Sequence, residues 1–255
     1  MSHPEQLGFL RLCRDHLCAS YRDPEFIEIG SYDLHGGGIR NVFTDTGRYV
    51  GVDLVEGPGV DVVASGHEIA LPDSSFDVAI SSECFEHNPY WAETFENMYR
   101  MLRPGGLLIM TCATTGRVEH GTDRTNPDFS PGTTSRGWSY YRNLTRQDFE
   151  SRFDLASMFQ LHRFYTAQTS NDLYFVGYKP GAEVAHDIAA LDRGVAMLSE
   201  ERRRGMSLPK RVARNAARAP LGVLSKLVPE TTFQNIAVPY SKVLYRIGSR
   251  FGLGI

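Results

Sequence analysis

The sequence predicts a doubly wound α/β fold with a mostly parallel sheet, a closing antiparallel strand and a helical C-terminal appendage. Three observations support this prediction. Short, almost entirely apolar runs recur over the first 112 positions, as in strands buried on both faces of a parallel sheet. Segments with helical spacing or turn residues separate these runs. Polar and glycine residues directly follow the runs, where open α/β sheets place their ligand crevice.

The first elements alternate between helix and strand. Apolar residues in 4–20 lie three to four positions apart, which predicts an amphipathic helix on one face of the sheet. Residues 25–29 form the first buried strand, which ends at Gly30 and continues into a polar, glycine-rich turn. We expect a helix to begin near Gly38 and to point its N-terminal amides at a ligand.

Four further apolar runs predict the second to fifth strands, at 49–52, 60–64, 76–80 and 107–112. The second run ends at Asp53, which puts an acid at the carboxyl end of a strand. A helix is expected over 89–102, where the apolar residues share one face. The sequence Arg103-Pro104-Gly105-Gly106 should end this helix, because proline cannot continue it and glycine permits a left-handed turn.

The remainder of the predicted domain contains a long polar segment and a closing strand pair. Residues 114–143 are rich in Gly, Thr, Pro and Arg and lack periodicity, so we interpret them as a substrate loop. Thr145 to Asp148 form a capping-box pattern that begins a helix. The runs 157–165 and 173–178 are expected to pair as strands.

A domain boundary is expected near residue 180, which divides the chain into a domain at 1–180 and an extension at 181–255. Helices are predicted over 182–204, over 209–228 with an interruption at Pro220, and over 240–251. From Arg202 to the end the chain has eleven Lys and Arg against one acid, Glu230, a net charge of +10 that leaves −13 for the rest. An acidic body therefore carries a basic tail.

Three interpretations of the basic tail stay open. It is a helical appendage or homodimerisation arm, a surface that contacts an anionic membrane or a lipid-linked substrate, or a nucleic-acid binding segment. The third is the least favoured, because the basic segments are rich in Ala and Val and offer few aromatic side chains for stacking on bases.

Composition limits the class of protein. A chain of 255 residues with 42% hydrophobic and 22% charged residues is typical of a folded globular protein, which excludes a fibrous or disordered one. The first residues lack the pattern of a secretion signal, and no run approaches the ~20 apolar residues that span a bilayer, so a cytoplasmic protein is expected. The four cysteines show no paired metal-ligand spacing and are interpreted as reduced thiols.

Several motifs follow one another in the order of a known family. They are Glu28-Ile29-Gly30, Gly51-Val52-Asp53, the segment 71–77, Glu83 to His87 after the fourth strand, and the segment 102–108 with its Pro-Gly-Gly turn. In this order the sequence resembles the class I S-adenosylmethionine-dependent methyltransferases, in the branch of small-molecule and ubiquinone-type enzymes. The resemblance covers residues 25–112 closely and 145–180 loosely, and it implies a Rossmann-like fold with S-adenosyl-L-methionine as cofactor.

The resemblance also implies which residues bind the cofactor: Glu28, Gly30, Ser31, Tyr32, Asp53, Leu54, Ser65, Gly66, His67 and Ser81. Gly30 would let the backbone approach the amino-acid end of the cofactor, and Glu28 would orient the loop or meet the ammonium through water. Asp53 would accept both ribose hydroxyls. Residues 65–67 lie where the family binds adenine, and Ser81 would offer its carbonyl to the ammonium.

The sequence departs from the family at two places. The first turn of the family has two further glycines, where this chain has Tyr32 and Leu34 and delays its glycines to 36–38. The adenine position usually holds Asp, where this chain has Ser65. We expect the cofactor to keep its pose while some of its polar contacts change.

Methyl transfer requires a nucleophile held in line with the methyl group, and a base when the acceptor is a hydroxyl. His87, His120 and Glu119 are the candidate bases, because all three are expected on loops above the strand ends. Glu119 and His120 with Asp123 and Asp128 form a possible ion-binding group, but their spacing matches no metal signature and no metal site is predicted.

The predicted activity is S-adenosylmethionine-dependent methyl transfer, with O-methylation of a small molecule, saccharide or glycan in a biosynthetic pathway. Trp138, Tyr140 and Tyr141 are plausible walls for a ring-shaped acceptor. Two alternatives stay open. One is an NAD-dependent oxidoreductase, although Gly30-Ser31-Tyr32 does not supply the Gly-x-Gly-x-x-Gly turn. The other is a cofactor-binding module that its basic tail recruits to a membrane or a partner.

Overall fold

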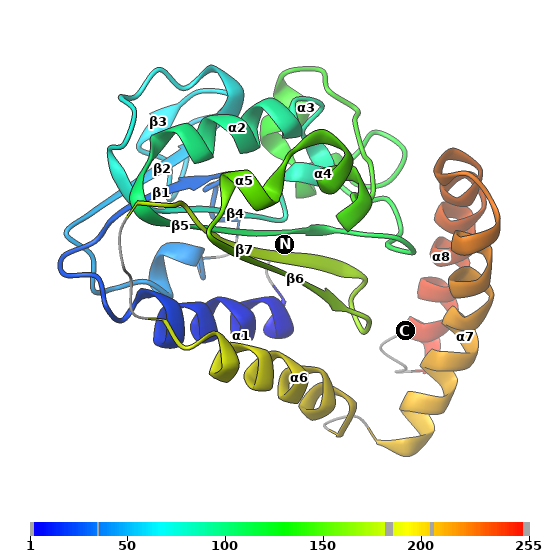
Figure 1. The fold of residues 1–255 in the computed structure, drawn as a ribbon. Coiled ribbons are helices and arrows are strands. Elements are labelled where there is room, and N and C mark those ends of the chain that lie inside the picture. The colour runs from blue at the N-terminus through cyan, green and yellow to red at the C-terminus, as the bar shows by residue number, and fades with distance from the viewer. Residues whose placement is uncertain (1–2, 35, 182–185, 205–206, 252–255) are drawn as a thin grey trace.

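The computed structural model describes residues 3–34, 36–181, 186–204 and 207–251. Within these residues one seven-stranded sheet forms the centre of the molecule (Figure 1). Its strand order is β3-β2-β1-β4-β5-β7-β6, and β7 runs antiparallel to both of its neighbours. The strands are β1 (Glu25–Ile29), β2 (Arg48–Asp53), β3 (Val62–Val63), β4 (Phe76–Ser82), β5 (Leu102–Ala113), β6 (Leu161–Ala167) and β7 (Asp172–Tyr178). The predicted fold class is confirmed.

Helices α2 (Trp91–Met101), α3 (Pro131–Ser135), α4 (Arg146–Arg152) and α5 (Leu155–Met158) lie over one face of the sheet (Figure 1). Apolar side chains of this layer pack on the strands in one cluster that contains Phe95 and Phe149, whose ring centroids are 5.4 Å apart. Thr145 caps α4 through a reciprocal hydrogen-bond pair with Asp148, as the sequence predicts.

The other face is covered by α1 (Pro4–Cys13), a π-helical turn (Arg14–Cys18) and α6 (Ile188–Arg204). The predicted apolar stripe is buried here, with Leu10 and Leu17 fully inaccessible to solvent. Helix α6 packs closely on α1, since a Cβ added at Gly8 would lie only 2.6 Å from Leu198. The predicted start of this helix at 182–185 lies outside the described residues, and the division at residue 180 stays a prediction.

The helix expected near Gly38 is absent, and this prediction is wrong. A single 3₁₀ turn, Ile39–Asn41, stands in its place. The Asp33 carboxylate accepts hydrogen bonds from the backbone amides of Gly36 (2.8 Å), Gly37 (3.2 Å) and Gly38 (3.0 Å). These amides therefore bind a side chain of the same loop, and β2 begins too soon afterwards for a longer helix.

Helices α7 (Leu208–Leu227) and α8 (Glu230–Phe251) form a hairpin beside the sheet (Figure 1). Helix α7 continues through Pro220, so the predicted interruption is wrong. Leu221, the next residue, packs against Phe233 of α8, and this contact supports the helix across the proline. Helix α8 also begins earlier than residue 240, where the sequence placed it.

The hairpin of α7 and α8 contacts the predicted substrate loop. Val118 packs against the small apolar cluster between the two helices. The Gln234 side chain accepts a hydrogen bond from the Glu119 amide at 2.9 Å and donates one to the Arg117 carbonyl at 2.9 Å. Among the residues that the structure describes, no helix is long and apolar enough to cross a membrane.

Candidate active site

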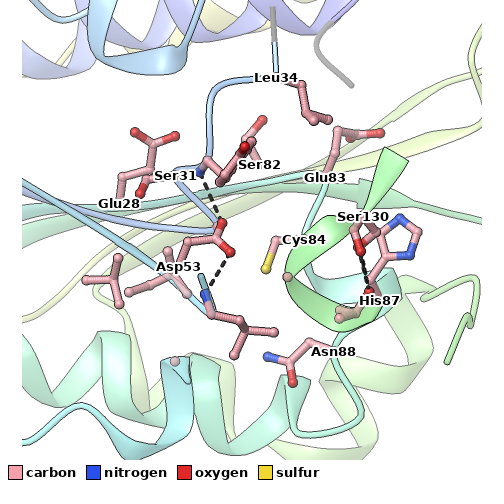
Figure 2. Close-up of a pocket in the computed structure, with 18 of the residues that line it drawn as sticks. Glu28, Ser31, Leu34, Asp53, Ser82, Glu83, Cys84, His87, Asn88 and Ser130 are labelled. Carbon is pink, nitrogen blue, oxygen red and sulfur yellow. Dashed lines mark hydrogen bonds between the residues drawn. The ribbon is translucent and has the colours of Figure 1, made fainter. Parts of the chain in front are cut away.

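A cavity of about 300 Å³ lies at the carboxyl ends of β1, β2 and β4 (Figure 2). The turn after β1 lines one part of it, the end of β2 and the segment 64–66 another, and the segment after β4 a third. Residues 129–133 and Trp138 of the substrate loop complete the wall. The ligand crevice that the sequence predicted is therefore present at the expected edge of the sheet.

The turn after β1 has its shape because it packs on the segment after β4. Gly30 has a φ of +83°, and a Cβ at this position would lie 2.7 Å from the Cβ of Cys84. Only glycine fits such a close approach without strain. The amides of Gly30 and Ser31 both donate to the Val52 carbonyl, at 2.9 and 3.1 Å, so the turn is fixed to β2.

Asp53 points into the cavity from the end of β2 (Figure 2). Its Oδ2 accepts a hydrogen bond from the Tyr32 amide at 3.0 Å, and its Oδ1 accepts one from the Leu54 amide at 2.7 Å. Burial raises the pKa of this carboxyl. A Cβ at Gly132 would lie 2.7 Å from Asp53 Oδ1, so the substrate loop closes directly over the carboxylate. Each oxygen keeps acceptor capacity for a ligand.

Glu28 lines the same cavity from within β1 and is only 4% exposed. Its Oε2 accepts a hydrogen bond from the Tyr49 hydroxyl at 2.7 Å. Burial raises the pKa of Glu28 to about 7, although the bond from Tyr49 opposes this shift. Glu28 is thus a buried acid with one partner in the protein.

Most of the residues predicted to bind the cofactor line the cavity. These are Glu28, Gly30, Ser31, Tyr32, Asp53, Leu54, Ser65 and Gly66. His67 and Ser81 do not line it. The His67 ring stacks on Tyr90 at a centroid distance of 4.0 Å, and the Ser81 hydroxyl donates to the Ile29 carbonyl at 3.0 Å. The binding roles of all ten residues stay predictions.

The opposite end of the cavity is formed by His87, Asn88, Ser130 and Trp138. In the view of Figure 2, His87 and Asp53 lie on opposite sides of Cys84. Burial lowers the pKa of His87 to about 3, so its imidazole is neutral. The Trp138 and Tyr90 rings lie edge to face with centroids 5.6 Å apart. This end offers an aromatic wall and a neutral imidazole to a second ligand.

The structure brings two of the three candidate bases together. The rings of His87 and His120 lie nearly perpendicular with centroids 5.0 Å apart, and Tyr141 contacts both. Burial lowers the pKa of His120 well below its usual value. Glu119 is bound elsewhere: its carboxylate accepts from the Thr122 hydroxyl at 2.6 Å and lies 3.4 Å from Arg124. The catalytic roles stay predictions.

Sequence reasoning did not single out Asp33, Glu83, Cys84 and Glu86 as separate site residues. Glu83, with a φ of +52°, and Cys84 line the cavity, and Glu86 lies against His87. Burial, with the charges of neighbouring carboxylates, raises the pKa of Glu83, and burial raises that of Glu86. The sequence signal that could have identified Glu83, Cys84 and Glu86 is their position directly after the fourth strand, at the edge of the sheet where ligands bind.

A crevice at the carboxyl ends of parallel strands, with an acid at the end of the second strand, defines a cofactor site of the nucleotide-binding α/β class. Residues 36–110 match the family model described as "Methyltransferase domain". This part of the chain is therefore similar to a methyltransferase domain, as the sequence resemblance predicts, and S-adenosyl-L-methionine is the cofactor that this resemblance implies. The predicted family and cofactor are confirmed, and the oxidoreductase alternative is not favoured.

Curated relatives match only part of this chain. An uncharacterized methyltransferase of Mycobacterium bovis (strain BCG / Pasteur 1173P2) is 33% identical over 92 residues, which are 30% of this chain and 36% of the relative. The phthiotriol/phenolphthiotriol dimycocerosates methyltransferase 1 of Mycobacterium ulcerans (strain Agy99) is 29% identical over 119 residues, 38% of this chain and 44% of the relative. The chain thus spans less than half the length of these relatives.

Solved structures with a similar fold include two bacterial proteins. The YcgJ protein of Bacillus subtilis has a TM-score of 0.49 at 11% identity and covers 71% of this chain and 100% of its own. The 1,6-didemethyltoxoflavin-N1-methyltransferase of Burkholderia thailandensis has a TM-score of 0.47 at 16% identity and covers 70% and 80%.

Proposed function

We propose that this protein transfers the methyl group of S-adenosylmethionine to an oxygen atom of a small molecule or saccharide in a biosynthetic pathway. The observation that carries this proposal is one cavity with two chemically different ends. Asp53 and the turn after β1 form the end that suits the cofactor. His87 and Trp138 form the end that suits an acceptor. A shared cavity supports direct transfer, which needs the two reactants in line and close together.

The residues at the first end fit the cofactor. Asp53 would accept hydrogen bonds from the ribose hydroxyls, while its contacts to the Tyr32 and Leu54 amides hold it in place. Two buried atoms on the cavity wall, Ser31 Oγ and Glu83 Oε2, have no hydrogen-bond partner in the described residues. They would satisfy the amino-acid end of the cofactor. The bound cofactor would supply an electrophilic methyl group on a sulfonium.

The residues at the second end would orient the acceptor and exclude water. The substrate loop closes over the cofactor end at Gly132 and reaches the acceptor end at Trp138. An acceptor whose ring packs beside Trp138 would place a hydroxyl next to the neutral imidazole of His87. His87 would thus form part of the wall beside the hydroxyl, while its low pKa makes it a weak base near neutral pH.

Two observations support a hydroxyl acceptor. The substrate loop is polar, with few aromatic side chains, which suits a saccharide or another hydroxylated molecule. The relative from Mycobacterium ulcerans is named for phthiotriol and phenolphthiotriol dimycocerosates, and this likeness covers 38% of the chain. Contact of the basic tail with an anionic membrane, recruitment to a partner and homodimerisation stay predictions.

Calorimetric titration with S-adenosylhomocysteine tests the cofactor step. We expect saturable binding to the full chain and an increase in its thermal unfolding temperature. Product formation with sugars, phenols and lipid-linked glycans, followed with a cofactor that carries a labelled methyl group, tests the acceptor class. Absence of both binding and thermal shift at millimolar ligand would contradict methyl transfer. Transfer to nitrogen or carbon would contradict only the assignment of oxygen.

A further inference from the structure

A group of buried hydrogen-bond acceptors lies behind the acceptor end of the cavity. It consists of the Glu86 carboxylate, the His87 imidazole and the His120 imidazole, and one ligand atom of each lies within 4.8 Å of the others. Of these three residues only His87 lines the cavity. The group therefore adjoins the proposed acceptor site through His87.

These acceptors lack donors. Glu86 is fully buried, and neither of its carboxylate oxygens has a hydrogen-bond partner on another described residue. His87 is 5% exposed, and its Nδ1 has none either. The Nε2 of His120 is likewise buried without a partner. Unpaired buried polar atoms are costly, and an uncompensated buried carboxylate more so, which indicates that a positively charged species belongs between them.

The second nitrogen of each ring shows which atoms are available. His120 Nδ1 lies 3.2 Å from the Val118 carbonyl and donates to it, which leaves a lone pair on Nε2. The His87 ring bonds to the backbone of Tyr140, and because its Nδ1 is unpartnered this bond involves Nε2–H. Metal-binding histidines typically donate their other ring N–H to a carbonyl or carboxylate in this manner. One nitrogen of each ring belongs to the group that contains Glu86.

We propose that Glu86, His87 and His120 bind one divalent transition-metal ion, such as Zn²⁺ or Fe²⁺. Two imidazole nitrogens and one carboxylate are a ligand set that these ions favour, and three protein ligands leave positions open for water or a bound molecule. Of the four residues that the sequence suggested as an ion-binding group, only His120 belongs to this site. Glu119, Asp123 and Asp128 do not.

The surrounding structure holds the ligands from two sides. Glu86 and His87 lie in a 3₁₀ turn, Phe85–His87, directly after β4. His120 comes from the substrate loop, which packs on His87 so closely that a Cβ at Gly121 would lie 2.9 Å from His87 Cε1. Gln234 of α8 binds the amide of Glu119, next to His120. We therefore assign Gln234 a positioning role, in which the C-terminal hairpin sets the place of one metal ligand.

Asp172 and Arg117, two other charged groups nearby, form a salt bridge with each other. His3 Nε2 lies 2.5 Å from Asp172 Oδ2, so the neighbouring group of His3, Glu83 and Asp172 contains a hydrogen bond between two of its members. Arg117 Nη1 lies 3.4 Å from Asp172 Oδ1 and donates to the Ser170 carbonyl at 2.7 Å. In the part of the chain that the structure describes, no cation forms a salt bridge with Glu86, and Arg117 acts on this carboxylate only through a longer-range charge interaction.

Metal binding is testable without an acceptor. The full chain is stripped with EDTA, dialysed and titrated with Co²⁺, whose visible absorption reports nitrogen coordination, and with Zn²⁺ in competition with a chromophoric chelator. We expect one ion per chain. Glu86→Gln and His120→Gln should each weaken binding by more than tenfold, and Gln234→Ala by about tenfold, as for outer-shell partners of metal ligands. His16→Ala, which changes a histidine far from the group in sequence, is the matched control and should bind as the wild type does.

Folding of the variants is checked by circular dichroism and by binding of S-adenosylhomocysteine. Glu86→Gln removes a buried charge and keeps the shape of the side chain, so it should fold even if His120→Gln does not. Zn²⁺ should raise the unfolding temperature of the wild type and leave that of Glu86→Gln unchanged. Absence of stoichiometric binding by the wild type would overturn the proposal, as would equal binding by Glu86→Gln.

The metal site does not rest on the proposed methyl transfer, and the two fail separately. Metal binding with no binding of S-adenosylhomocysteine would overturn only the enzyme function. Methyl transfer by a chain that binds no metal would overturn only the metal site. If Glu86→Gln and Gln234→Ala show the expected order of affinities, the Glu86 carboxylate is a ligand and the C-terminal hairpin positions His120.

Discussion

The two ends of the cavity are built in different ways. At the cofactor end, carboxylates bind backbone amides close by in the sequence: Asp33 holds the amides of Gly36 and Gly38, and Asp53 holds that of Leu54. At the acceptor end, Glu86 and His87 meet a loop residue, His120, that is itself held by a C-terminal helix. The first end is formed by hydrogen bonds within neighbouring strands and turns, whereas the second depends on residues from distant segments.

This difference indicates which end of the cavity has its final shape before a ligand binds. The cofactor end has its shape from hydrogen bonds that exist without ligand, so binding there should depend mainly on local residues. The acceptor end combines three separate parts of the chain and contains buried groups that need a partner. Substitutions in α8 should therefore affect the acceptor end and leave the cofactor end intact. Substitutions of Glu28, Asp53, Gln234 and Tyr32 test this separation.

The largest expected effect concerns the buried acid of the cofactor end. The pKa of Glu28 is raised from 4.5 to about 7 in the folded protein. Between these two pH values the folded protein therefore keeps a proton on Glu28 that the unfolded chain has lost. The folded state then binds more protons, so the free energy of unfolding decreases as the pH rises through the window, by about 3 kcal/mol in all. Above pH 7 this contribution is lost.

Glu28→Gln should remove this pH dependence, because an amide does not titrate while its oxygen still accepts from Tyr49. Urea denaturation of both proteins at pH 5 and pH 8, without ligand, measures the effect. Between these pH values the free energy of unfolding of the wild type should decrease by about 2.5 kcal/mol more than that of the variant. An equal change in both proteins would show that Glu28 ionises normally in the folded state.

Asp53→Ala should weaken binding of S-adenosylhomocysteine about 100-fold, which corresponds to about 2.7 kcal/mol. The carboxylate that would accept the ribose hydroxyls is lost, and the amides of Tyr32 and Leu54 lose their acceptor. Calorimetric titration gives the affinity, and Asp45→Ala, an exposed acid outside the cavity, is the control. Unchanged affinity in Asp53→Ala would remove Asp53 from the binding site.

Gln234→Ala should reduce stability by about 2 kcal/mol and reduce methyl transfer while binding of S-adenosylhomocysteine stays unchanged. Gln234 is 4% exposed and bonds to the Glu119 amide and the Arg117 carbonyl, so truncation leaves the buried Glu119 amide unpaired and removes one of the two donors to the Arg117 carbonyl. Asn235→Ala on the exposed side of α8 should change neither property. An equal loss of cofactor affinity in Gln234→Ala would show that the two ends are coupled.

The difference between local and distant contacts also explains which parts of the fold and of the site could be predicted from the sequence. The strands and the site at Asp53 follow from apolar runs and from the residue that ends each run, which are local signals. The helix expected at Gly38 failed because the Asp33 side chain satisfies the amides that would begin it. His87 and His120 are in contact although they lie 33 positions apart in the sequence, and no local pattern predicts such a contact. The continuous helix at Pro220 depends on packing against α8.

The smallest expected effect concerns Tyr32, where the family has a glycine. Tyr32 holds Asp53 through a hydrogen bond from its backbone amide, and Tyr32→Gly keeps this bond. Its ring packs on Gly57, where an added Cβ would lie 2.2 Å from Tyr32 Cε2. We therefore expect Tyr32→Gly to bind S-adenosylhomocysteine as well as the wild type or slightly better, with a change in affinity of about twofold, or about 0.4 kcal/mol. A loss of tenfold or more would show that the ring itself contacts the cofactor, and the cofactor end would then depend on a side chain that the family lacks.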